Sequence, residues 1–192
     1  FLKIHDDIIF NETRLNSDFQ TLAEYLINAP SDFFMYRDFQ SRNIIINNNK
    51  TYFIDYQGGR KGPLQYDIVS ILYQVKAQLP EKIKTILLDY YKEKLSRYIQ
   101  LDKIKFDEYY KSFILLRLLQ VLGAYGFRGL IQKKLHFLES ISYALKELIS
   151  LNKIISFPFE LKELKSVLDQ IEILLHRYKP ADNEKLTVII NS

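Results

Sequence analysis

Residues 35–43 read MYRDFQSRN, and residues 53–59 read FIDYQGG. These two stretches place three oxygen-bearing side chains, Asp38, Asn43 and Asp55, on two neighbouring loops. Phosphoryl transfer from ATP needs one carboxylate to orient or deprotonate the attacking hydroxyl. It also needs an amide and a second carboxylate to hold magnesium at the phosphates. The two stretches therefore predict a phosphoryl-transfer site.

The residues between the two stretches predict a β-hairpin. Residues 44–46 are three isoleucines, residues 47–50 are Asn-Asn-Asn-Lys, and residues 51–54 are Thr-Tyr-Phe-Ile. Asparagine tolerates the positive φ of tight turns, and β-branched and aromatic residues favour strands. Because a hairpin brings its two ends together, we expect Asn43 and Asp55 close enough to share an ion. Magnesium keeps several waters, so two protein ligands and the ATP phosphates would suffice.

In this context, residues 32–70 resemble the aminoglycoside phosphotransferase and choline kinase-like superfamily, which has a protein-kinase-like fold. The closest likeness is to bacterial sugar-kinase-like members. Besides the two loops, the resemblance rests on Gly62-Pro63, which follows Asp55 after six residues, and on residues 66–72, YDIVSIL. These elements occur in the order and at the spacing of the family pattern, which strengthens a motif that is weak alone.

The resemblance implies a role for each matching residue. Asp38 matches the catalytic base, and Asn43 and Asp55 match the two magnesium ligands. Asp67 matches a carboxylate that braces the catalytic loop without reacting. The implied activity is transfer of the γ-phosphate of ATP, with Mg²⁺, to a hydroxyl of a small molecule, with a sugar or amino sugar as the leading acceptor.

Three positions depart from the family pattern and leave the phosphate-binding cation open. Tyr36 stands where the family has a bracing histidine, and its hydroxyl can still donate a hydrogen bond. Gln40 stands where protein kinases have a lysine, and a neutral amide cannot neutralise a phosphate. We therefore expect Arg42 to supply that charge. Residues 56–57 are Tyr-Gln in place of Phe-Gly.

The expected fold class is mainly α with a small β-hairpin, the C-terminal lobe of a protein-kinase-like fold. A kinase needs a glycine-rich loop over the phosphates and a strand lysine paired with a helix glutamate. The sequence shows neither, and it opens at Phe1 without a methionine. We therefore expect the N-terminal lobe upstream in a longer parent, and the fragment alone to be inactive. The lobe is expected over residues 1–178, with the catalytic loop and metal hairpin in 32–70 and a helical subdomain in 81–178.

Apolar residues recur at helical spacing through much of the chain. They predict helices over residues 17–28, 81–99, 106–125, 135–151 and 159–178. The helix over 106–125 is apolar nearly all round and is therefore expected to be buried. The helix over 81–99 carries an apolar stripe at Ile83, Ile86, Leu87, Tyr90, Tyr91 and Leu95.

Residues 120–129 contain three glycines within seven residues, which can break a helix and allow close backbone approach. One interpretation puts Gln120, Tyr125 and Arg128 at the acceptor pocket. A guanidinium can bind an anionic or hydroxyl-rich substrate, and aromatic faces suit sugars. The alternative is that the glycines only end a helix and permit tight packing.

Residues 179–192 change character. They begin with Lys-Pro-Ala-Asp-Asn, a linker signal, and continue with the β-branched run Leu-Thr-Val-Ile-Ile. We expect a linker and the first strand of a further domain. The sequence of this strand is similar to the opening of a RapZ-like C-terminal domain. The upstream lobe and this downstream domain would then be partners within one multidomain parent.

Composition narrows the remaining classes of partner. The chain has no cysteine, which excludes disulfides and thiolate metal sites and is compatible with a cytoplasmic location. No apolar stretch approaches the roughly 20 residues that cross a bilayer, so no membrane partner is expected. The net charge is +4, but lysine and arginine form no dense run. Nucleic-acid binding is therefore the minority interpretation.

A rival from another class is a non-catalytic module that binds nucleotide or a partner protein. Retention of Asp38, Asn43 and Asp55 counts against it, because a lapsed kinase has no physical need for all three. Tyr36, in place of the family histidine, counts for it.

Overall fold

The computed structural model describes residues 8–128, 132, 135–154 and 156–177. Its described residues are mainly helical, with two short antiparallel strand pairs, in agreement with the predicted α+β class. The predicted linker and strand at 179–192 lie outside the described residues. Among the residues described, no helix combines the length and the apolar character that a membrane span requires.

The chain divides into two compact units. We call residues 26–117 the central unit, and residues 1–25 with 118–192 the terminal unit. The division falls inside two helices, α1 (Glu12–Leu26) and α4 (Lys103–Gly126), so each of these helices contributes to both units.

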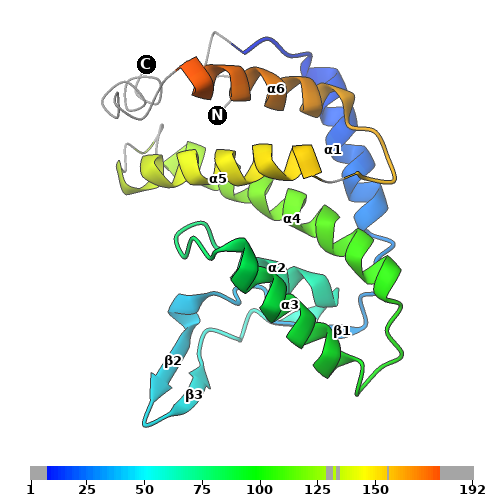
Figure 1. The fold of residues 1–192 in the computed structure, drawn as a ribbon, viewed down its shortest axis with the longest axis vertical. Helices are drawn as coiled ribbons and strands as arrows, with labels where there is room; N and C mark the ends of the chain where they lie inside the picture. Colours follow the sequence, from blue (N-terminus) through cyan, green and yellow to red (C-terminus); the bar gives the residue numbers. More distant parts are fainter. Residues whose placement is uncertain (1–7, 129–131, 133–134, 155, 178–192) are drawn as a thin grey trace. The chain divides into compact units, whose positions relative to one another are not determined.

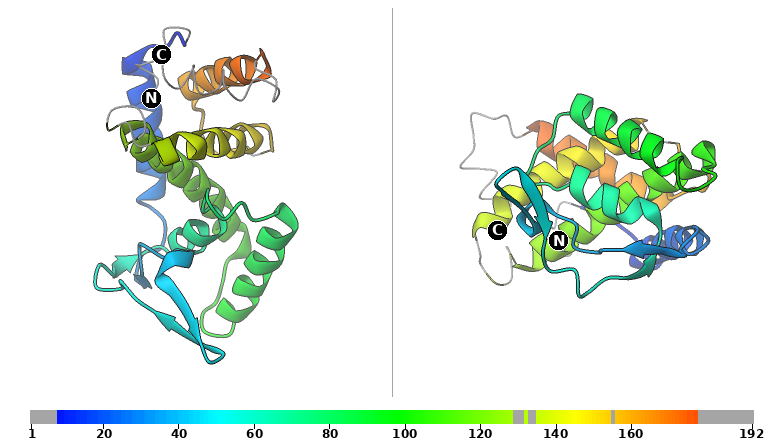
Figure 2. Two further views of the ribbon diagram at one scale, coloured as in Figure 1. Left: turned by 90° about the vertical axis from the view of Figure 1, so that its left-hand side faces the viewer. Right: turned by 90° about the horizontal axis from the view of Figure 1, so that it is seen from below.

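The central unit contains both strand pairs (Figure 1). Strand β1 (Phe33–Met35) pairs with β4 (Arg60–Gly62), and β2 (Ile44–Asn47) pairs with β3 (Lys50–Phe53). The β2–β3 hairpin turns through Asn48 and Asn49, whose φ angles are 49° and 57°. Two consecutive residues with positive φ match the twist of the flanking strands. The hairpin, cyan in Figure 2, is the one that the asparagine run predicted.

Three helices accompany the strands of the central unit: α2 (Leu64–Leu72), α3 (Glu81–Leu95) and the first part of α4. The core of this unit is formed by apolar side chains of α2 and α4 that are almost inaccessible to solvent. These side chains are Ile68, Val69, Leu72, Phe106, Phe113 and Ile114. Burial of this part of α4 agrees with its apolar sequence.

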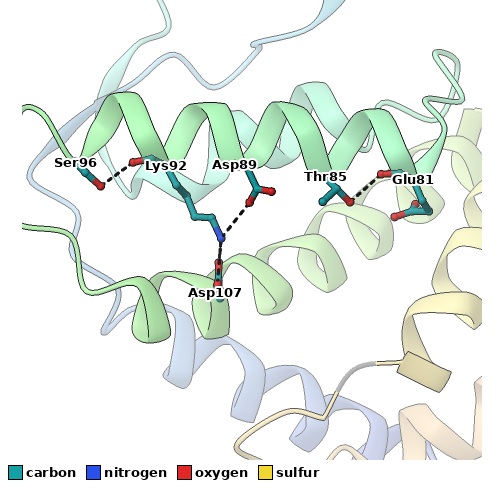
Figure 3. A network of polar contacts seen from close by, with 6 residues as sticks. All are labelled: Glu81, Thr85, Asp89, Lys92, Ser96 and Asp107. Atoms are coloured by element: carbon teal, nitrogen blue, oxygen red, sulfur yellow. Dashed lines mark hydrogen bonds and ion pairs between the residues drawn. The ribbon is translucent and has the colours of Figure 1, made fainter.

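Helix α3 buries a face that its sequence pattern did not single out. Lys84 is 4% exposed, and its Nζ atom lies 2.6 Å from Glu81 Oε1 and 4.2 Å from the centre of the Tyr73 ring. Lys92 is also turned inward, with Nζ 3.0 Å from Asp107 Oδ1 on α4 (Figure 3). Charged groups can occupy such positions because each has an anionic partner.

The apolar stripe of α3 divides between exposed and partly buried positions. Tyr91 and Leu95 are partly buried. The other four predicted members are all at least 40% exposed, and they are Ile83, Ile86, Leu87 and Tyr90. These four residues form what we call the outer stripe.

The terminal unit is built from α1, the end of α4, α5 (Leu135–Ile154) and α6 (Lys162–Arg177). Helices α5 and α6 lie side by side (Figure 1).

The prediction that α1 begins at residue 17 is wrong. The Oδ1 atom of Asn11 accepts a hydrogen bond from the Arg14 N–H at 3.0 Å, so Asn11 caps the helix six residues earlier. Asp18 in turn accepts the Leu164 N–H at 2.8 Å, in the first turn of α6.

The first of the glycines near the end of α4 does not break the helix. Helix α4 runs through Gly123 and ends at Gly126. The other predicted helices have observed counterparts with ends displaced by a few residues.

Candidate active site

The loop before Asp38 is tied down by Asp67, which lies in the first turn of α2. One carboxylate oxygen of Asp67 accepts the Tyr36 N–H at 2.6 Å, and the other accepts the Arg37 N–H at 2.9 Å. Burial raises the pKa of the Asp67 carboxyl, and the nearby Asp38 adds to this, while the two N–H bonds oppose it. The geometry gives Asp67 a positioning role.

Tyr36 joins this loop to the strand that leads into Asp55. Its side chain is buried, and its hydroxyl donates a hydrogen bond to the carbonyl oxygen of Ile54. Burial raises the pKa of the Tyr36 phenol, and the carboxylates around it, with Asp55 first, raise it further. The hydroxyl is therefore held protonated as a donor between the two loops.

Asn43 connects the Asp38 loop to the hairpin. Its side chain is buried, and Nδ2 donates to the main-chain carbonyl of Asp38 at 2.8 Å. Its own carbonyl accepts the Ile54 N–H at 3.1 Å, just beyond the Ile44–Phe53 pair that ends the ladder. The backbone thus brings Asn43 and the residue before Asp55 together. Among the described residues, the Asn43 Oδ1 atom has no hydrogen-bond partner.

Asp38 and Asp55 present exposed carboxylates from constrained backbone. Asp55 has a φ of 65°, and Arg37, which precedes Asp38, has a φ of 76°. Residues other than glycine rarely adopt such angles, and those that do cluster at functional sites. Gln57 Nε2 donates to Asp55 Oδ1 at 2.7 Å, whereas the Asp38 carboxylate has no ion pair or hydrogen bond within the described part of the chain.

The two residues expected at the phosphates differ in what they offer. Arg42 is exposed, and its guanidinium has no partner among the described residues. Gln40 is partly buried, and its main-chain carbonyl accepts the Asn43 N–H at 2.9 Å, which shapes the loop. Of these two residues, Arg42 is the one whose side chain carries a positive charge that can pair with a phosphate.

Three features of the site were missed in the sequence. Arg37 turns its guanidinium toward the Gly58 carbonyl, with Nη1 at 3.4 Å. Gln74, just after α2, accepts the Ser41 N–H at 3.0 Å, and no local pattern marks such a long-range contact. A Cβ atom at Gly59 would lie 2.6 Å from the ring of the exposed Phe34 and 3.0 Å from the Tyr56 carbonyl oxygen, so a larger residue at this position would have to displace that ring. The Gly-Gly pair was a visible signal for this close approach.

The described residues contain no group of three or more histidine, cysteine, aspartate or glutamate side chains that could hold a metal ion. The available set is one amide oxygen from Asn43 and one carboxylate from Asp55. These hard oxygen donors suit Mg²⁺, which commonly takes one or two carboxylates and completes its shell with water and substrate phosphates. The donor set therefore fits magnesium bound together with a nucleotide.

The residues predicted at an acceptor pocket lie in the terminal unit. Gln120 and Arg128 are exposed and Tyr125 is partly buried, near the end of α4. The same unit holds a largely apolar cavity of about 390 Å³ between α1, α4, α5 and α6, and none of these three residues lines it. Because Asp38 belongs to the central unit, their role at an acceptor pocket stays a prediction.

No protein-family model and no curated protein matches this chain.

Proposed function

We propose that the chain is the C-terminal lobe of a small-molecule kinase of the aminoglycoside phosphotransferase and choline kinase-like superfamily. The observation that carries the proposal is the link through Asn43, whose amide nitrogen holds the Asp38 carbonyl while its backbone pairs beside Asp55. These contacts support the proposal because they bring the backbone at Asp38 and the residue before Asp55 to Asn43.

The proposed reaction transfers the γ-phosphoryl group of ATP to a hydroxyl. The acceptor oxygen forms a bond to the γ-phosphorus, the bond from that phosphorus to the β–γ bridging oxygen breaks, and ADP leaves. Asp38 orients the hydroxyl and takes its proton. Its carboxylate suits this task because it is exposed and makes no competing contact among the described residues.

Asn43 and Asp55 would hold magnesium through the amide oxygen and a carboxylate oxygen. The bound metal would neutralise charge on the β- and γ-phosphates during transfer. Arg42 would add positive charge at the phosphates, a task that Gln40 cannot perform. Asp67 and Tyr36 would fix the loop geometry, on which catalysis by positioning depends.

The test is ATP consumption by the parent protein with magnesium, across sugars, amino sugars and aminoglycosides. Asp38→Asn and Asp55→Asn should each lower turnover with the best acceptor by at least about 100-fold. Asp32→Asn is the matched control. Asp32 is an exposed aspartate of the same unit whose described contact is a surface ion pair with Lys61 at 3.2 Å. This variant should keep its activity.

Two results would contradict the proposal. If Asp38→Asn and Asp55→Asn both turned over as fast as the wild type, the site would be misassigned. If the wild type bound ATP but transferred phosphate to no acceptor, the regulatory-module alternative would be favoured.

A further inference from the structure

The outer stripe of α3 is an apolar surface that stays open to solvent. Its four side chains, Ile83, Ile86, Leu87 and Tyr90, are between 40 and 57% exposed. Their spacing of i, i+3, i+4 and i+7 places them on one face over two turns. Scattered exposed apolar residues need no explanation, but a continuous apolar stripe marks an interaction surface.

The fold does not require this stripe to be apolar. The inward face of α3 is formed by other residues, among them Lys84 and Lys92, which are held by Glu81 and Asp107. Lys94 lies across one end of the stripe, with Nζ 4.9 Å from the centre of the Tyr90 ring. The stripe is thus separate from the contacts that hold α3 in the central unit.

We propose that the outer stripe is the contact surface with a second copy of this chain, formed by antiparallel packing of α3 against α3. The spacing of the stripe reads the same in both directions. A two-fold axis between Ile86 and Leu87 therefore sets Ile83 opposite Tyr90 of the second copy, and Ile86 opposite Leu87 of the second copy. Such a contact is self-complementary, as a two-fold interface must be.

The charges beside the stripe favour the antiparallel arrangement. Lys82 and Glu93 are eleven residues apart, close to three helical turns, so they lie on the same flank of the outer stripe. Antiparallel packing brings like flanks together. About the same axis, Lys82 lies two residues, or about 3 Å along the helix, from the position opposite Glu93 of the second copy, so these two long side chains can meet once at each end. Lys82 has no ion pair among the described residues, whereas Glu93 has a surface pair with Arg97 at 2.6 Å.

The small size of the surface indicates a weak association. Two turns of one helix bury much less than the roughly 800 Å² per partner that is typical of stable complexes. The expected dissociation constant is therefore on the order of 0.1 mM. This proposal does not depend on the kinase assignment.

Sedimentation equilibrium of the 192-residue chain over a range of concentrations tests the proposal. Ile86→Lys should weaken self-association at least about tenfold, because it puts two cations at the centre of the interface. Ile173→Lys on α6 is the matched control, because Ile173 is 54% exposed and lies outside the stripe. It should dimerise as the wild type does. Circular dichroism would establish that both variants fold.

A charge exchange tests the antiparallel geometry separately. Lys82→Glu and Glu93→Lys should each weaken the dimer, and the double variant should restore it. A chain that stays monomeric up to about 1 mM would overturn the proposal, and so would an Ile86→Lys variant that dimerises normally. Failure of the double variant to restore association would overturn the antiparallel packing.

Discussion

Helices α3 and α4 are antiparallel neighbours in the central unit, and both carry apolar residues at helical spacing, yet they bury them differently. In this unit α4 turns Phe106, Phe113 and Ile114 into the core, where each is at most 5% exposed. Helix α3 leaves Ile86 and Leu87 more than 40% exposed. Apolar periodicity therefore identifies a face that can be buried, and the neighbouring elements decide which face is buried.

The neighbours of α3 supply polar partners as well as apolar ones. The Tyr91 hydroxyl donates to the Leu64 carbonyl at 3.2 Å, and Lys92 reaches Asp107. Each inward polar group thus has a partner that reduces the cost of its burial. Helix α4 needs fewer such contacts, because its buried residues in this unit are mostly apolar, and the hydroxyl of its buried Ser112 donates to the Glu108 carbonyl one turn earlier.

The largest difference between the helices should appear when matched isoleucines are truncated. Ile114→Ala on α4 should lower the free energy of unfolding by about 3 kcal/mol, because it leaves a cavity in a packed core. Ile86→Ala on α3 should change it by about 0.5 kcal/mol or less, because that side chain is half exposed. Urea denaturation at low protein concentration measures both. Equal losses would show that the outer stripe is part of the core.

A smaller effect should appear at high pH, at the inner face of α3. Burial, with a contribution from Asp67, raises the pKa of Tyr91 to about 12 from an ordinary value of 10.0. The folded state therefore binds the phenolic proton more tightly than the unfolded state, and stability falls as pH rises from 10 to 12. Allowing for partial exposure, Tyr91 should contribute a loss of about 1 to 2 kcal/mol over that range.

The variant Tyr91→Phe should lack this contribution, and denaturation at a series of pH values compares its slope with that of the wild type. Parallel profiles would contradict the prediction. At pH 7, where the phenols are protonated, Tyr90→Phe on the outer stripe controls for removing a hydroxyl from α3. It should cost less than Tyr91→Phe, which also loses the hydrogen bond to Leu64.

Removing the anion or the cation of the Lys84–Glu81 pair should change the free energy of unfolding by different amounts, with the larger change about 1 kcal/mol. Glu81→Gln should lower the free energy of unfolding by about 1 kcal/mol, because it removes the carboxylate that lies 2.6 Å from the buried Lys84 ammonium. Lys84→Met should be within about 0.5 kcal/mol of the wild type, because an apolar chain of similar length replaces the ion pair. Lys82→Met, exposed on the same helix, controls for helix propensity. If Lys84→Met cost more than Glu81→Gln, Lys84 would be fixing the orientation of α3.

Prediction from the sequence succeeded where the signal was local. The hairpin followed from three adjacent asparagines, and the helices from apolar periodicity. The start of α1 was missed because Ser17 and Asn11 are both acceptable caps, and Asn11 lies before the apolar pattern becomes clear. The contact between Gln74 and Ser41 joins positions 33 residues apart, which no local pattern specifies.

The same distinction applies within the candidate site. Asp38, Asn43 and Asp55 were named from their spacing, and the hairpin brings their backbones together.

The orientation of α3 was not predictable, because it depends on Asp107 of α4 and on Tyr73, which lies after α2. Either the apolar face of α3 or the face with Lys84 and Lys92 could have packed against the neighbouring helices. The sequence of α3 alone does not show which face is buried, because that depends on the side chains that the neighbouring elements provide.

The smallest predicted effect tests whether charge pairing between the helices sets this orientation. The Lys92–Asp107 pair has side chains 16 and 40% exposed. By contrast, both side chains of the Arg97–Glu93 pair, which joins α3 to the residues just after it, are 60% exposed. Double-mutant cycles to alanine should give a coupling energy of about 1 kcal/mol for the first pair and about 0.3 kcal/mol for the second, because solvent screens the exposed pair more strongly. The difference in coupling energy between the two pairs should persist at high salt, because screening removes most of the coupling of the exposed pair. Equal coupling in the two cycles would mean that Lys92 is turned inward by the packing around it, and that the charge on Asp107 does not choose the face of α3 that is buried.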